Sequence, residues 1–97
     1  MNKNSYVYIL CSKRNGTLYI GVTSDLIKRI WQHKNKVVEE FTKKYNVDNL
    51  CYFETFNDIT MAINREKELK KLRRQEKLDL IETHNPEWID LYYELIG

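Results

Sequence analysis

The stretch that decides the fold runs from Tyr6 to His33 and reads YVYILCSKRNGTLYIGVTSDLIKRIWQH. Its first part, Tyr6–Cys11, alternates aromatic, β-branched and other apolar residues in a pattern typical of a strand. Thr17–Val22 alternates again after an Asn-Gly turn signal, so the two runs predict a β-hairpin. Asp25–His33 follows with capping residues and apolar residues at helical spacing. A hairpin that leads into a helix is therefore the centre of the predicted fold.

The length of the hairpin loop decides where its two tyrosines lie. A four-residue loop places Ser12 opposite Thr17. Tyr19 is then opposite Leu10 and diagonal to Tyr8, with about 7–8 Å between backbones. A two-residue turn also keeps both tyrosines on one face but separates them by roughly 13 Å. We favour the four-residue loop because it brings the two tyrosines together.

The first helix is expected to bury an apolar stripe. Arg29 and His33 are four residues apart, so they should share one side of this helix, away from the centre of the stripe. The stripe itself consists of Leu26, Ile27, Ile30 and Trp31.

The remaining chain predicts one more strand and several helices. Asn35–Asn49 is expected to be a loop with a helical turn at Phe41 and Tyr45, and Leu50–Phe56 has strand composition. Asn57-Asp58 can cap a long helix whose apolar positions are Ile59, Ala62, Ile63, Leu69 and Leu72. A further helix carries Leu78, Leu80 and Ile81. A last helix is expected to begin at Asn85-Pro86, with Trp88, Leu91, Tyr92 and Leu95 on its apolar face. Together these elements predict a small sheet with helices, of the α/β or α+β class.

Glu66 is an acidic residue inside the apolar stripe of the long helix. It lies four residues after Ala62 and three before Leu69, so the helix turns its carboxylate toward the protein body. An unpaired charge is costly there, so a partner is expected. Either a functional cation or a structural ion pair with Arg29 or Arg65 would meet this need.

Length and composition predict a single domain over residues 1–97, with a core at about 5–83 and a C-terminal helical brace at 85–97. No stretch has the length of a membrane span or the shape of a signal peptide, so we expect a cytoplasmic protein without membrane contact. Cys11 and Cys51 are far apart in the sequence, which favours small core residues over a zinc or disulfide pattern.

The formal net charge of +2 conceals a strong asymmetry. Residues 1–77 hold all sixteen Lys and Arg against nine acidic residues, whereas residues 78–97 hold five acidic residues and no Lys or Arg. A basic body suits a polyanion such as DNA or RNA, although solvated basic helices are the commoner explanation. The candidate nucleic-acid-binding residues are Lys28, Lys43, Lys44, Lys67, Lys70, Lys71, Arg73 and Arg74.

These features together resemble the GIY-YIG nuclease family. The resemblance rests on Tyr6-Val7-Tyr8 and Tyr19-Ile20-Gly21 on two strands, on Arg29 and His33 on the following helix, and on Glu66 on a later helix. It covers nearly the whole chain and is strongest for small stand-alone bacterial members similar to the nuclease domain of the ABC excinuclease. It implies a three-stranded antiparallel sheet flanked by helices.

The resemblance also implies a site and a reaction. Tyr8, Tyr19, Arg29, His33 and Glu66 match the family's catalytic positions, and Glu66 matches its single metal ligand, for Mg²⁺ or Mn²⁺. The implied function is a metal-dependent endonuclease that hydrolyses DNA phosphodiester bonds, with RNA as a further substrate class. Because a chain of this length has no separate sequence-reading domain, we expect structure-selective cleavage in DNA repair or recombination. A protein partner that supplies specificity and a monomeric state are further expectations.

The chain departs from the family pattern at three places. Tyr6 stands at the first Gly of the motif, Val22 at a Lys of the excinuclease-type domains, and Leu78 near an Asn of many members. The last two departures motivate an alternative function, a non-catalytic nucleic-acid-binding module on the same scaffold. A protein-interaction domain that has only inherited the scaffold is a third possibility.

Overall fold

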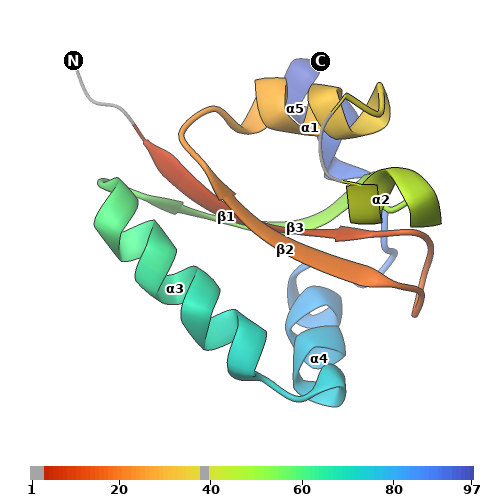
Figure 1. Ribbon diagram of the computed structural model, residues 1–97. Coiled ribbons are helices and arrows are strands. Elements are labelled where there is room, and N and C mark those ends of the chain that lie inside the picture. Colours follow the sequence, from red (N-terminus) through yellow and green to blue (C-terminus); the bar gives the residue numbers. More distant parts are fainter. Residues whose placement is uncertain (1–3, 38–39) are drawn as a thin grey trace.

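The computed structural model describes residues 4–37 and 40–97 and contains one three-stranded antiparallel sheet with helices on both faces (Figure 1). The sheet has the order β2-β1-β3, so the two strands of the hairpin are neighbours. This arrangement confirms the predicted α+β class. No helix in the described ranges is long and apolar enough to cross a membrane. The elements are β1 (Ser5–Cys11), β2 (Leu18–Thr23), α1 (Leu26–Lys34), α2 (Glu40–Tyr45), β3 (Asn49–Phe56), α3 (Ile59–Lys71), α4 (Arg74–His84) and α5 (Leu91–Ile96).

The hairpin has the wider of the two predicted loops. The backbone N–H of Ser12 donates to the carbonyl of Thr17 at 3.0 Å, and Leu10 pairs with Tyr19 across the strands. Asn15 supports the loop in the left-handed backbone region, at φ 58°. Tyr8 and Tyr19 therefore lie diagonally on one face of the sheet, as predicted.

The two faces of the sheet are covered by different helices. In Figure 1, α3 and α4 lie on one side of the sheet and α1 and α5 on the other. On the side of α3, Val7 and Ile9 pack with Leu69 and Ile81. On the side of α1, Tyr8 and Leu10 pack with Ile30. Alternate residues of β1 thus enter two separate cores, which fixes the face on which each later side chain lies.

In α1 and α3 the buried face differs from the predicted stripe. In α1, Leu26, Ile30 and His33 are buried, whereas Ile27 and Trp31 are 43% and 51% exposed. The prediction that all four apolar residues of α1 form the buried stripe is wrong, because the buried imidazole takes part of that face. In α3, Ala62 and Leu69 are buried, while Ile59 and Ile63 at the edge of the stripe are largely exposed. Glu66, between the two buried positions, is partly buried as predicted, with 17% of its side chain exposed.

The last helix begins later than the Asn-Pro signal predicts. α5 begins at Leu91, capped by Asp90, whose carboxylate accepts a hydrogen bond from the N–H of Tyr92. Asn85 is buried and donates to the carbonyls of Cys51 and Ile89. Its amide therefore holds the 85–90 segment as a turn against β3, and the proline does not start a helix there.

Candidate active site

Tyr8 is placed in the interior by β1. Its side chain is 2% exposed, and its hydroxyl shares a hydrogen bond of 3.0 Å with Nε2 of His33. A buried hydroxyl and a buried imidazole each require a partner, and this bond supplies one to both. Tyr8 is thus a fixed interior residue that can act on a substrate only through its neighbours.

Gly21 makes room for the Tyr8 ring. The two residues face each other across the hairpin. A Cβ at position 21 would lie within 3.0 Å of Cζ, Oη and Cε1 of Tyr8. Gly21 does not have a positive φ, so the requirement here is for space and not for an unusual backbone conformation. The glycine of the Tyr19-Ile20-Gly21 motif therefore positions the tyrosine of the neighbouring strand.

His33 is the most buried polar residue of this cluster, at 1% exposure. Its Nδ1 lies 3.0 Å from Oγ1 of Thr42 on α2, opposite the bond from Nε2 to Tyr8. The prediction that His33 lies away from the buried stripe is wrong, because both ring nitrogens have polar partners inside the protein. Sequence reasoning missed Thr42, since nothing in its spacing from His33 distinguishes it from other residues of the 35–49 segment.

Tyr19 connects the buried cluster to the surface. Its ring centroid lies 6.5 Å from that of Tyr8, 5.6 Å from that of His33 and 6.3 Å from that of Phe41. Tyr19 is only half-buried, and it lines an open cavity of about 360 Å³. Three of the five predicted catalytic side chains are therefore in direct contact, and Tyr19 is the one of these three that reaches solvent.

Arg29 lies on α1 one turn before His33, but it lines a hollow separate from the cavity beside Tyr19. Asp25 caps α1 by accepting from the N–H of Lys28 at 3.1 Å. Arg29 and Lys28 line a shallow polar hollow of about 230 Å³ near this helix start. The Arg29 guanidinium offers a planar set of donors to an anion, whereas the N-terminal end of the helix is already capped by the Asp25 carboxylate in the same hollow. The structure places Arg29 one helical turn before His33 of the tyrosine and histidine cluster.

Glu66 approaches the site from the other face of the sheet. Its Oε2 lies 3.6 Å from Nζ of Lys70, one turn later on α3. The competing ion pair with Arg65 is not formed, because Arg65 binds Glu54 through Nε and Nη2 and also contacts Glu68. Lys70 lines the same cavity as Tyr19, so α3 and β2 both contribute to one opening.

The metal chemistry that this site allows depends on a single carboxylate. In the described part of the chain, no three His, Cys, Asp or Glu side chains gather into a cluster that could enclose an ion. Mg²⁺ commonly keeps several water ligands and binds through one or two carboxylates plus substrate phosphate oxygens. The partly buried carboxylate of Glu66 fits this kind of open site. The ammonium group of Lys70 would have to move aside for an ion to bind.

The predicted nucleic-acid-binding residues divide by their contacts. Arg74 donates to the carbonyls of Asn15 and Gly16 at 2.7 Å each, so it ties α4 to the hairpin loop. Arg73 pairs with Glu76 and caps α4. Side chains exposed to solvent are Lys28 on α1, Lys43 and Lys44 on α2, and Lys67, Lys70 and Lys71 on α3. Sequence reasoning did not single out Lys77, although it lines the cavity beside Tyr19.

Comparison with known proteins identifies the class that this fold and site define. Residues 4–79 match the family described as the GIY-YIG catalytic domain. The chain belongs to this family.

Named relatives extend this result to small stand-alone proteins. The chain is 41% identical over 76 residues to a UPF0213 protein from Staphylococcus saprophyticus, covering 78% of this chain and 92% of the relative. It is 40% identical over 89 residues to a UPF0213 protein from Syntrophus aciditrophicus, covering 90% and 98%. A solution NMR structure of a UPF0213 protein from Bacillus halodurans has a TM-score of 0.56 and 29% identity, covering 90% of this chain and 92% of that one. The fold is thus shared with a solved relative.

Proposed function

We propose that this protein is a metal-dependent endonuclease that hydrolyses DNA phosphodiester bonds. The observation that carries the proposal is the contact of Tyr8 on the central strand, Tyr19 on the edge strand and His33 on α1 within a GIY-YIG catalytic domain. Phosphodiester hydrolysis requires an oriented nucleophile and stabilisation of the charge that develops on the phosphate oxygens. The side chains around β2 can meet both requirements.

Tyr19 is the residue that orients the attacking water in this proposal. It is half-buried and opens to the cavity, so its phenol can reach a substrate, whereas Tyr8 and His33 are enclosed. A phenol with a pKa near 10 is a weak base, so orientation of the water is its main contribution until a nearby cation lowers that pKa. Tyr8 and His33 hold the Tyr19 ring by packing and provide polar groups behind it.

Arg29 is the phosphate-binding residue. Its guanidinium has a planar set of donors that matches two phosphate oxygens. The polar hollow around it is also lined by Lys28, whose ammonium adds to the attraction, and by the Asp25 carboxylate, which already caps the start of α1. A phosphate bound here would be adjacent to the helix that carries His33.

Glu66 is the residue that would hold a divalent ion, Mg²⁺ or Mn²⁺. When bound, such an ion supplies positive charge to the phosphate oxygens. Lys70 neutralises the carboxylate of Glu66 when no ion is bound, since its Nζ lies 3.6 Å from Oε2. A single partly buried carboxylate is compatible with an ion that takes its other ligands from water and substrate phosphate.

A non-catalytic nucleic-acid-binding module is the second candidate function. The Glu66–Lys70 pair favours it, because a carboxylate satisfied by an internal cation has no need of a metal. In that case the exposed lysines would contact phosphates without any cleavage, and binding would weaken steeply with salt.

Cleavage of labelled linear, nicked and branched DNA in Mg²⁺ or Mn²⁺ tests the proposal. We expect product that requires the metal and falls by about 10²–10⁴-fold in Tyr19→Phe, the range for loss of one acid–base group. Glu66→Gln should abolish the metal-dependent product. Glu68→Gln is the matched control, because Glu68 lies on the same helix but is 67% exposed and pairs with Arg65. Product that survives chelation, or that Glu66→Gln leaves unchanged, would refute the metal-dependent mechanism. Binding without product from any of these DNAs would favour the second candidate.

A further inference from the structure

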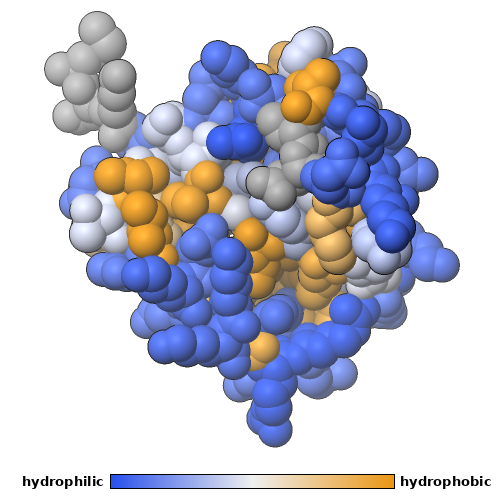
Figure 2. Space-filling view, viewed as in Figure 1, coloured by the Kyte–Doolittle hydropathy of each residue, from blue (hydrophilic) through white to orange (hydrophobic). Residues whose placement is uncertain are grey.

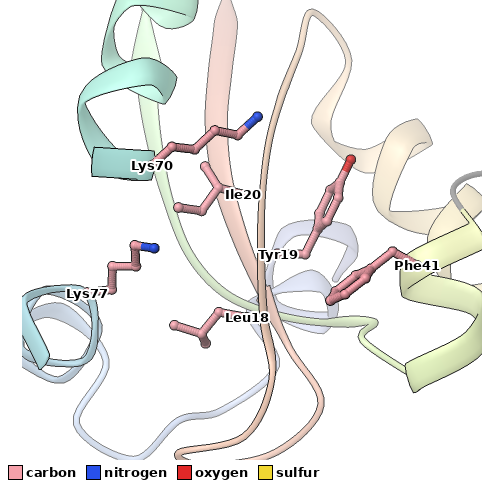
Figure 3. Close-up of a pocket in the computed structure, with 6 residues that line it drawn as sticks. All are labelled: Leu18, Tyr19, Ile20, Phe41, Lys70 and Lys77. Atoms are coloured by element: carbon pink, nitrogen blue, oxygen red, sulfur yellow. The ribbon is translucent and has the colours of Figure 1, made fainter. Parts of the chain in front are cut away.

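The cavity beside Tyr19 has two walls of different chemistry. Leu18, Tyr19 and Ile20 of β2 form its floor, and the remaining lining residues are Phe41 of α2, Lys70 of α3 and Lys77 of α4. Figure 2 shows apolar surface within this hollow and polar surface around it. In Figure 3 the two lysines lie on one side of β2, and the Tyr19 and Phe41 rings lie on the other. The cavity volume of about 360 Å³ is within the usual range of small-ligand sites.

Tyr19 and Phe41 form the aromatic wall, and Tyr45 lies beside Phe41 outside the residues that line the cavity. Tyr19 and Phe41 are stacked with an interplanar angle of 28°, and Phe41 lies 5.0 Å from Tyr45 between ring centroids. Phe41 is nevertheless 43% exposed and Tyr45 is 49% exposed. An apolar ring that remains in solvent beside an open cavity is a natural surface for a flat ligand to cover.

The lysine wall adds a requirement for negative charge. Lys77 forms no side-chain hydrogen bond or ion pair with residues in the described ranges, although it lines the cavity. Lys70 is shared with Glu66 and would be released when that carboxylate binds a cation. A ligand for this cavity therefore combines a flat aromatic face with an anionic group, which is the chemistry of a nucleotide.

We propose that this cavity binds an unpaired nucleotide of the DNA, with its base on the Phe41 ring and a phosphate of the same strand at Lys77. The base must be unpaired, because both faces of a base inside a duplex are covered by its neighbours, whereas a single strand offers its bases for stacking. The inference rests on the proposed function, since it names the DNA structure that the Tyr19 site accepts. It assigns to Phe41 the selection of single-stranded or gapped DNA over intact duplex.

Fluorescence anisotropy with labelled DNA in chelator tests this inference without cleavage. We expect the wild type to bind single-stranded and gapped DNA about tenfold or more tightly than duplex of the same sequence, the scale of one stacked base. Phe41→Leu should remove most of this preference and leave duplex affinity unchanged, while Phe41→Tyr should retain it. Tyr93→Leu is the matched control, because Tyr93 is 61% exposed on α5 and does not line the cavity.

The lysine contact has its own matched pair of variants. Lys77→Ala should weaken binding of gapped DNA and lower the salt dependence of that binding by about one phosphate contact. Lys71→Ala removes the same charge from the exposed end of α3, outside the cavity, and should weaken gapped and duplex DNA equally. Phe41 is largely exposed, so its variants are expected to fold, and a circular dichroism melt checks this.

The outcomes separate this inference from the proposed function. Equal affinity for gapped and duplex DNA, or an equal loss for both in Phe41→Leu, would overturn the inference even if metal-dependent cleavage were observed. A preference that depends on Phe41 without cleavage of any DNA would support the nucleotide site and refute the nuclease proposal.

Discussion

Replacement of Gly21 by alanine is the most direct test of how the site is assembled. The added Cβ would lie within 3.0 Å of three atoms of the Tyr8 ring, including Oη and Cζ. The backbone at Gly21 does not have a positive φ, so alanine is compatible with its conformation and the effect is steric. Because Tyr8 is enclosed by β1, β2 and α1, its ring cannot move without disturbing other contacts.

The size of the effect follows from two terms. Forcing an extra methyl group into a packed interior costs about 1–3 kcal/mol. Displacing the Tyr8 hydroxyl also weakens its 3.0 Å hydrogen bond to His33, which is worth about 1 kcal/mol. Together these predict a loss of about 2–4 kcal/mol in the free energy of unfolding. For a domain of this size that corresponds to a fall in Tm of roughly 8–30 °C.

Thermal and denaturant unfolding of Gly21→Ala measures this loss. Gly97→Ala is the matched control, because a Cβ at position 97 meets nothing closer than the Tyr93 carbonyl at 3.9 Å. Gly21→Ala and Tyr8→Phe both affect the hydrogen bond between Tyr8 and His33. The double variant should therefore lose less free energy of unfolding than the sum of the two single variants. A Gly21→Ala protein within about 0.5 kcal/mol of the wild type would refute the reasoning, since that is the range of ordinary surface substitutions.

Two further predictions concern polar contacts that the sequence does not reveal. Thr42→Val removes the hydroxyl beside Nδ1 of His33 with little change in volume, and we expect about a tenfold fall in kcat with a smaller change in KM. Thr42→Ser should restore activity, and unchanged kinetics in Thr42→Val would exclude a role for this contact. The second prediction concerns the pKa of the Glu54 carboxyl. Burial raises this pKa, but hydrogen bonds from Arg65 and Tyr52 lower it by more, so the net shift is downward. The ionised Glu54 carboxylate therefore contributes its full stabilisation of the folded state above the pKa of about 4.3 in the unfolded chain. This contribution is lost as pH falls through the lower pKa of Glu54 in the folded protein. Glu54→Gln should be less stable at pH 7 and should vary less with pH in acid, as measured by urea unfolding from pH 3 to 7. An unchanged pH profile would show that the pair contributes nothing.

The hairpin is predictable from sequence because its determinants are local. Residue alternation assigns the faces of both strands, and the loop between Ser12 and Thr17 sets the register that places Tyr19 opposite Leu10. The burial of His33 is different, because it depends on partners 25 and 9 residues away, Tyr8 and Thr42. A hydrophobicity pattern ranks Trp31 above a histidine for the interior and cannot weigh two buried hydrogen bonds.

The start of the last helix is a second feature that depends on contacts between residues far apart in the sequence. Asn85-Pro86 has the composition of a helix start, but the Asn85 amide binds the Cys51 carbonyl of β3 at 3.0 Å. Asp90 binds both β3 and α1, because its carboxylate accepts hydrogen bonds from the N–H of Leu50 and from the ammonium of Lys34. Tertiary contacts therefore decide where α5 begins. Local capping preferences only indicate residues at which a helix could begin.

The position of Glu66 relative to Tyr8 and Tyr19 depends on which face of the sheet α3 covers. Periodicity shows that Glu66 faces the protein, but it does not say which face of the sheet α3 covers. In the structure Leu69 of α3 packs with Ile20, on the face opposite Tyr8 and Tyr19. β2 is one of the two outer strands of the sheet, and its consecutive residues Tyr19 and Ile20 line one cavity from both faces of the sheet, together with Lys70. A DNA strand that lies along β2 can therefore meet the tyrosine from one face and the α3 side chains from the other. A site built in this way requires an uncovered edge strand, which explains why a three-stranded sheet with β2 outermost suits the proposed reaction.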